Sequence, residues 1–429
     1  MTKVSTISTA KALSMYIAAS LFLFFEMALQ VSPSVMSFQL MHDLSMGTFA
    51  LGIMSGCYFY TYTLMQIPSG RLLDKFNPRL IITVAIIVCC LGALLLSIAQ
   101  GLIVACAARL LMGFGSAFAF VAVLTVTADL FKSKYFATLT GVTQMLAALG
   151  AMSGQLPISL VVNHLGWRES MQLFAVMGVL LAILIYGYLR YERTPINTCL
   201  PEHKASLHNP IRKIVANPQT WYIALYACLL WAPMSGFTSL WGVPFLVKVY
   251  GLSHSSAAFT CSLMWVGLAV ASPLLGYVST RFSNRKLPLS LSALFGGLGF
   301  GCVLIFHLSG AWLALGLIIA GAACAGQALS FTLVKENNPK HVTATAIAFN
   351  NVAVVISGAI FQPLIGWLLK VLDFSSAADF RIALSVIFIA YFIAFIVSVF
   401  FINETMRDWR ARDIGTKNAA PQVIGDHCA

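Results

Sequence analysis

The chain has 429 residues, of which 59% are hydrophobic and only 9% are charged. A soluble domain carries about 25% charged residues, so this composition excludes a soluble globular protein and indicates one that crosses a lipid bilayer many times. The net charge of +12 would suit a nucleic acid, but the chain has no basic stripe interleaved with aromatic residues, and we expect no nucleic-acid partner.

Long apolar stretches recur along the whole chain, and each has the roughly 20 residues that a helix needs to cross a bilayer. Residues 1–11 are polar and run directly into the first stretch, so no cleavable signal is evident. We predict twelve transmembrane helices, in chain order at 12–36, 48–70, 80–99, 101–130, 136–162, 169–190, 220–247, 255–280, 287–307, 311–334, 342–370 and 380–402.

Basic residues are distributed unequally between the two sides that these spans define. With the N-terminus in the cytoplasm, the cytoplasmic segments hold 21 of the 26 Lys and Arg residues. The external segments hold four, and Arg109 lies within a span. Such an excess of positive charge marks the cytoplasmic side, so we expect both termini there.

The polar stretch after the sixth span divides the chain into two halves. We expect a bundle of six helices in 1–193, a cytoplasmic linker in 194–218, a second bundle of six helices in 219–403, and a cytoplasmic tail in 404–429. The linker is too polar to cross a membrane and too short to form a domain.

An internal repeat supports this division. The segment from Gly70 to Arg79 recurs in degraded form from Gly276 to Arg285, 206 residues later. Both copies are charged turns that open with glycine and join two apolar spans. Duplicated halves with a site between them are the architecture of secondary transporters.

The charged turns and the fourth span together resemble the major facilitator superfamily over essentially all twelve spans. The first turn, with Gly70, Asp74, Lys75 and Arg79, is similar to the family's signature loop, although Asn77 replaces its second glycine. The run from Arg109 to Gly115 resembles the family's fourth-span motif. The resemblance implies the major facilitator fold, an all-α membrane protein, and a conformational gate formed by Gly70, Asp74, Lys75, Arg79, Asp129, Gly276, Arg281 and Arg285.

Only two ionisable residues lie deep within spans, Glu26 and Arg109. A charge at the bilayer centre costs at least about 2.5–3.5 kcal/mol, so it normally faces a cavity or a partner. One hypothesis is that they bind substrate or carry a coupling proton. The other is a structural pair in which Glu26 only neutralises Arg109. The sequence leaves both open.

Polar and aromatic residues within the spans supply the other candidates for substrate binding, because a buried amide or hydroxyl needs a hydrogen-bond partner that a solute can provide. We select Tyr62 and Trp241 first, and then Gln30, Tyr58, Gln144 and Asn350. Trp231 and Asn351 are in similar positions. Interfacial aromatic residues and amides that only tie helices together remain the alternative interpretation.

The sequence contains no constellation that indicates an enzyme. The ten cysteines are scattered and form no metal-spaced pair, and no phosphate-binding loop or nucleophile elbow occurs. We therefore expect no enzyme activity, no cofactor and no metal, and the partners to be a small solute, the lipid bilayer and, if transport is coupled, protons.

The segment from Phe25 to Met36 and the run from Arg109 to Gly115 resemble bacterial facilitators of amino acids and dipeptides. This resemblance implies a transporter of amino acids or short peptides in the bacterial inner membrane. A proton-coupled drug exporter is less favoured because the fifth span lacks a Gly-Pro dipeptide. Uptake of an organic anion or a siderophore stays open, since Arg109 would serve either, and so does a receptor that transports nothing.

Overall fold

The computed structural model describes residues 9–131, 133–188, 212, 214–282, 284–339, 343–372, 374 and 376–405, and these residues fold into helices without any strand. The described residues of the first half form nine helices: α1 Thr9–Val31, α2 Pro33–Asp43, α3 Thr48–Lys75, α4 Pro78–Ser97, α5 Leu102–Ser116, α6 Ala119–Leu130, α7 Ser133–Ser153, α8 Leu156–Leu165 and α9 Trp167–Tyr188.

The second half repeats this plan with a π-helical segment, η1, in its first span. Its elements are α11 Pro218–Ala232, η1 Pro233–Trp241, α12 Gly242–Tyr250, α13 His254–Arg281, α14 Lys286–Ile305, α15 Gly310–Cys324, α16 Gln327–Glu336, α17 Thr343–Val371, α18 Ala377–Ile396 and η3 Val397–Phe401.

Local sequence explains where several of these helices begin. The side chain of Asn77 accepts a hydrogen bond from the backbone N–H of Arg79, and Pro78 occupies the first turn of α4. Asn217 and Pro218 do the same at the start of α11. An asparagine cap satisfies a backbone N–H that has no partner within the helix, and proline loses nothing at this position.

Eleven of the twelve predicted spans are confirmed within the described residues, with boundaries that differ by a few residues. Eleven helices of the described residues are long and apolar enough to cross a membrane. The twelfth is α3, a helix of 28 residues that is less apolar because it carries the polar residues of the predicted site. It packs along α17, which is itself one of the eleven.

Helix boundaries also show the duplication. Helix α13 begins and ends 206 residues after α3, and α16 ends 206 residues after α6. The fourth span breaks between α5 and α6, and its counterpart breaks at the matching place between α15 and α16. Equivalent breaks in equivalent spans indicate that the two halves descend from one six-helix unit.

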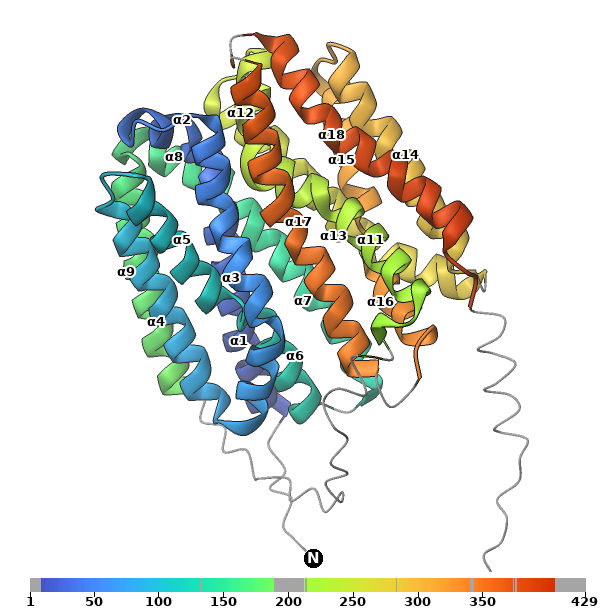
Figure 1. Cartoon of the computed structure of the whole chain (residues 1–429). Helices are drawn as coiled ribbons and strands as arrows, with labels where there is room; N and C mark the ends of the chain where they lie inside the picture. The colour runs from blue at the N-terminus through green and yellow to red at the C-terminus, as the bar shows by residue number, and fades with distance from the viewer. Residues whose placement is uncertain are drawn as a thin grey trace, which may run out of the picture.

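The two halves lie side by side, with α3 and α17 adjacent between them (Figure 1). We call the end that holds α2, α8 and α12 the upper end, and the end where α1 begins and α3 finishes the lower end (Figure 1). At the upper end α2 packs on η1 and α12, and α8 packs on α13.

Contacts at the upper end are close enough to exclude side chains. A Cβ atom added to Gly52 would lie 2.5 Å from the carbonyl oxygen of Gln362, and one added to Gly358 would lie 2.6 Å from the Phe59 ring. The Thr48 hydroxyl donates to the carbonyl of Gly366 at 2.9 Å. The upper ends of α3 and α17 therefore meet almost backbone to backbone.

Several predictions lie outside the described residues. They include nearly all of the linker 194–218, the tail beyond Thr405, and the side chains of Asp74, Lys75 and Asp129. The domain boundaries and the roles of these three charged residues stay predictions.

Candidate functional site

A cavity lies between the two halves, at the middle of the described helices. The cavity volume is about 110 Å³, and the atom-free space within its walls is about 950 Å³ when open solvent is included. Its walls come from α1, α3, α6 and α7 of the first half and from α11, α13, α16 and α17 of the second. A solute bound here would touch both halves.

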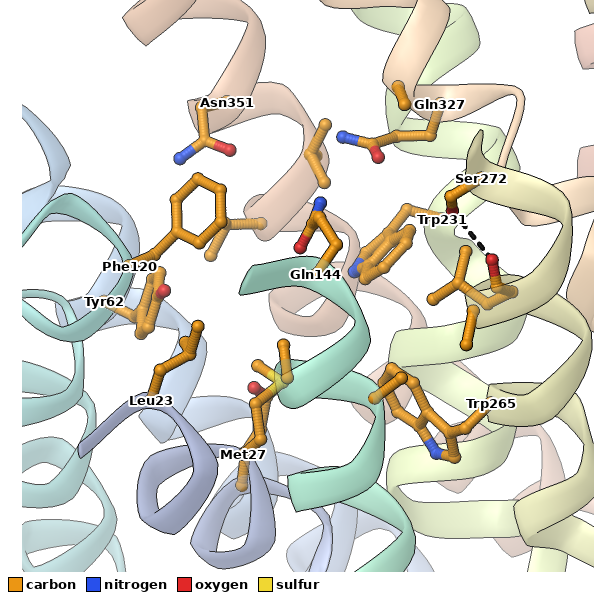
Figure 2. Close-up of a pocket in the computed structure, with 18 of the residues that line it drawn as sticks. Leu23, Met27, Tyr62, Phe120, Gln144, Trp231, Trp265, Ser272, Gln327 and Asn351 are labelled. Carbon is orange, nitrogen blue, oxygen red and sulfur yellow. Dashed lines mark hydrogen bonds between the residues drawn. The ribbon is translucent and has the colours of Figure 1, made fainter. Parts of the chain in front are cut away.

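Hydrogen-bonding side chains and aromatic rings line the cavity. Figure 2 shows Gln144 near its centre, Tyr62, Phe120 and Asn351 on one side, and Gln327, Trp231 and Ser272 on the other. Gln30, Tyr58, Phe59, Trp265 and Phe331 complete the polar and aromatic lining. None of the described residues in the wall carries a formal charge.

Glu26 lies behind this wall and is completely buried on α1. The Tyr58 hydroxyl donates a hydrogen bond to its Oε1 atom at 2.6 Å. Its other oxygen, Oε2, is buried and has no hydrogen-bond partner. Since Tyr58 also lines the cavity, one phenol connects the carboxyl group with the solute space.

Arg109 on α5 is also completely buried. Its two terminal nitrogens donate to the carbonyl oxygens of Leu29 and Gln30, each at 3.4 Å. The Leu29 carbonyl would normally accept from the backbone N–H four residues later, but that residue is Pro33, which has none. The Ser32 hydroxyl donates to this carbonyl at 3.0 Å, and the guanidinium is a second donor to it at the break between α1 and α2.

Glu26 and Arg109 form no direct ion pair in this conformation, and the hypothesis that Glu26 only neutralises Arg109 stays a prediction. No ion pair joins the two side chains within 4.0 Å, although both are described. Instead Tyr58 lies next to both, because the guanidinium carbon is 4.6 Å from the centre of its ring. The tyrosine separates the two charged groups and contacts each.

The structure brings four of the predicted binding residues to the cavity wall, namely Gln30, Tyr58, Tyr62 and Gln144. It places Trp241 and Asn350 elsewhere. The Trp241 indole donates to the carbonyl of Gln362 at 3.0 Å, and the Asn350 amide donates to Ser330 at 2.7 Å. In this conformation both are packing residues.

Six polar or aromatic wall residues were not selected from the sequence, namely Phe59, Phe120, Trp265, Ser272, Gln327 and Phe331. Gln327 had a recognisable signal, because it is the only amide in 310–336. Trp265 and Ser272 had no such sequence signal, since neither residue type is unusual in a transmembrane helix.

The predicted gate residues are distributed between the two charged turns. Arg79 stacks over the Tyr186 ring at 3.9 Å. Arg285 forms an ion pair with Glu336 at 3.2 Å, while Arg281 is exposed at the end of α13. Glycine at positions 70 and 276 does not bring helices into close contact in this conformation, because a Cβ atom added at either position meets no atom within 4 Å.

A second polar cluster holds α2 at the upper end. Arg168 forms an ion pair with Asp43 at 2.9 Å, and the Trp167 indole donates to the same carboxylate oxygen at 2.8 Å. A ring nitrogen of His42 lies 3.0 Å from the other oxygen. The hydrogen bond from His42 is the largest of the contacts that lower the pKa of Asp43 below its usual value.

Comparison with known proteins identifies the fold. A family model described as Major Facilitator Superfamily matches residues 15–362 and 233–423. The chain resembles the solved structure of a bacterial homolog to the human lysosomal transporter Spinster in an inward-facing and occupied conformation. The TM-score is 0.77 and the identity 17%, over 91% of this chain and 97% of that one. A nucleoside transporter, NupG, gives a TM-score of 0.76 at 13% identity, over 90% and 100%.

Curated relatives are also transporters. The uncharacterized transporter YybO of Bacillus subtilis (strain 168) is 24% identical over 75% of this chain and 79% of its own. The hexuronate transporter of Escherichia coli (strain K12) is 24% identical over 78% and 82%, and the putative tartrate transporter of Agrobacterium vitis is 22% identical over 76% and 79%.

These relatives do not support the expected resemblance to amino-acid and dipeptide facilitators. They do bear out the predicted superfamily and its architecture, since the family model covers most of the chain and the solved structures share its helical arrangement. The chain belongs to the major facilitator superfamily of transporters.

Proposed function

We propose that this transporter moves a small hydroxylated organic anion, of the sugar-acid type, together with a proton. The observation that carries the proposal is the cavity between the halves, where amides and aromatic rings form the wall and Arg109 lies directly behind Tyr58. Amides can hydrogen-bond several hydroxyl groups, and aromatic faces pack against the apolar face of a sugar-like molecule.

Arg109 supplies the attraction for an anion. Glu26 and Arg109 are the only formal charges deep within the spans, and interactions between charges are strong where water is excluded. A proton on Glu26 leaves Arg109 uncompensated, so the cavity favours an anion. Anion binding in turn favours the protonated carboxyl, because linkage between two ligands is reciprocal.

The surroundings of Glu26 agree with a proton site. The unpartnered Oε2 atom is buried, and an unpaired carboxylate is costly to bury unless it binds a proton. The titratable groups nearest to it are Tyr58 and Tyr62 on α3, Cys89 on α4 and Arg109 on α5. Among these, Tyr58 alone hydrogen-bonds the carboxyl directly.

The names of several relatives agree with an anionic substrate. They include transporters for hexuronate, for tartrate and for galactarate or D-glucarate. Their shared chemistry is a carboxylate on a short hydroxylated chain or ring. This is the chemistry that the amides and Arg109 would recognise.

We further propose that the upper end faces the outside and that both termini lie in the cytoplasm of a bacterial cell, at its inner membrane. The excess of Lys and Arg in the lower-end segments supports this orientation. With the upper ends of α3 and α17 in close contact, the conformation is then closed to the outside.

A second candidate is a neutral polar solute such as a nucleoside. The lack of any formal charge among the described wall residues favours it. The earlier expectation of an amino acid or short peptide stays a prediction, and it requires Tyr58 to move aside so that Glu26 and Arg109 can both reach the zwitterion.

Uptake by purified protein in proteoliposomes distinguishes these substrates. The panel would contain glucuronate, tartrate, glucarate, uridine and a dipeptide, each with and without an inward proton gradient. We expect the gradient to drive accumulation of at least one hydroxylated acid. Accumulation of uridine or the dipeptide, with no uptake of any acid, would reject the proposal.

A further inference from the structure

We infer that Gln66 and Asn351 form a gate: a contact between the two halves that closes the lower end of the cavity and breaks when that end opens. The amide nitrogen of Asn351 on α17 donates to Oε1 of Gln66 on α3 at 2.5 Å. This bond joins side chains 285 positions apart in the sequence, one from each half. The inference rests on the proposed function only in taking the cavity as the path of the solute.

The position of the bond suits a gate. Helix α3 runs from the upper end to the lower end, and Gln66 lies one helical turn beyond Tyr62, which lines the cavity. Asn351 lies eight residues from the start of α17, which begins at the lower end. The pair therefore joins the two halves just below the solute space.

The contact between α3 and α17 differs in strength along its length. At the upper end glycine lets the two helix backbones pack closely, and a Cβ atom at Gly52 would lie 2.5 Å from the carbonyl oxygen of Gln362. At the lower end the hydrogen-bonded contact described between these helices is the one between two flexible amides. Close packing at one end and a single hydrogen bond at the other predict that the lower end separates first.

The gate is also connected to the cavity wall. Asn351 belongs both to the wall and to the bond. Figure 2 shows Asn351 in the wall, on the side of Tyr62 and Phe120. Tyr62 lies one helical turn before Gln66 on α3 and stacks on Tyr58, with the ring centroids 5.8 Å apart. A solute that hydrogen-bonds Asn351 therefore competes with the contact that keeps the gate closed.

Access to the cavity measures the gate without requiring a known substrate. Ala147 lines the cavity, is almost completely buried, and lies on α7 one turn beyond Gln144 toward the upper end. We would introduce Ala147→Cys and follow its reaction with N-ethylmaleimide in purified protein. Peptide-resolved mass spectrometry reads this cysteine separately from the ten native ones.

Gln66→Met and Asn351→Leu keep side-chain size and remove the bond. Each should raise the labelling rate about 3- to 10-fold, as expected for the loss of one hydrogen bond from the closed state. The double variant should label no faster than the faster single variant. The exchanged pair Gln66→Asn with Asn351→Gln keeps the combined length and should return the rate toward that of the parent.

The matched control is Tyr60→Phe, which removes another hydrogen bond between the same helices, from the Tyr60 hydroxyl to the Ala359 carbonyl at 3.2 Å. Its labelling rate should stay unchanged. Parent-like rates in both gate variants would overturn the inference, and so would equal acceleration in Tyr60→Phe. Because no solute is added, the result stands even if the uptake panel rejects a sugar acid as substrate.

Discussion

The hydroxyl of Tyr58 lies 2.6 Å from Oε1 of Glu26, and it is the only hydrogen bond that this buried carboxyl makes. The same phenol lines the cavity and stacks beside the Arg109 guanidinium. A change in the solute space can therefore reach the carboxyl through one side chain.

Tyr58→Phe tests this connection. The variant keeps the ring that stacks on Arg109 and removes the one donor to Glu26. We predict that proton-driven accumulation falls at least about 10-fold, as for the loss of a hydrogen bond to a charged group, while exchange without a gradient changes less. Tracer uptake with and without a pH gradient measures both. Equal losses in the two assays would mean that Tyr58 only binds solute.

Arg109→Lys tests the role of the guanidinium at the break in α1. Lysine keeps the charge but loses the planar fork that reaches the carbonyls of Leu29 and Gln30. The Leu29 carbonyl keeps the Ser32 hydroxyl as a donor, but the two hydrogen bonds from the charged guanidinium are lost. A hydrogen bond to a charged group contributes about 1.5–3 kcal/mol, so the melting temperature in detergent should fall by several degrees.

The same loss should depend on Pro33. Pro33→Ala restores a backbone N–H that can donate to Leu29, so Arg109→Lys should destabilise the protein less in that background. A double-mutant cycle of thermal unfolding measures the difference, expected at about 1 kcal/mol. Identical losses in both backgrounds would show that Arg109 does not substitute for the missing N–H.

Gly52→Ala tests the close contact at the upper end. The new Cβ would lie 2.5 Å from the Gln362 carbonyl oxygen, so the halves must separate there. We predict a lower melting temperature and reduced exchange. Gly70→Ala is the control on the same helix, because its Cβ meets no atom within 4 Å. Similar effects of Gly52→Ala and Gly70→Ala would show that the change in helix propensity, and not the close contact, causes them.

Asp43→Asn tests the cluster that holds α2. Hydrogen bonds from His42 and Trp167 and the nearby Arg168 lower the pKa of Asp43, so its contribution to stability is present above the unfolded-state pKa of about 3.9. That contribution is lost as pH falls through the lower pKa of the folded state. At pH 7 the variant should melt a few degrees lower than the parent. Unchanged melting would show that the exposed pair adds nothing measurable.

The fold was predictable from the sequence because each span is set by local hydropathy, and α13 follows α3 at the same offset as the charged turns. The face that each helix turns to the cavity was not predictable from the sequence. Asn350 and Asn351 are neighbours, yet only Asn351 lines the cavity. Successive residues point about 100° apart around a helix, so the choice depends on how the helices pack.

The depth of Glu26 and Arg109 was also predictable, because charges are rare within spans. Their separation by Tyr58 was not. It follows from the direction of the guanidinium, which turns to the Leu29 carbonyl because Pro33 offers that oxygen no N–H. The proline was visible in the sequence, but its effect on α5 required the packing of α5 against α1.

Proton coupling through Glu26 is tested most directly by comparing the parent with Glu26→Gln in proteoliposomes, using the hydroxylated acid that the uptake panel selects. Both accumulation under an inward proton gradient and exchange at equal pH would be measured. We predict that the variant exchanges solute but no longer accumulates it, because glutamine cannot bind or release the coupling proton. Full gradient-driven accumulation by Glu26→Gln would contradict the proposed mechanism.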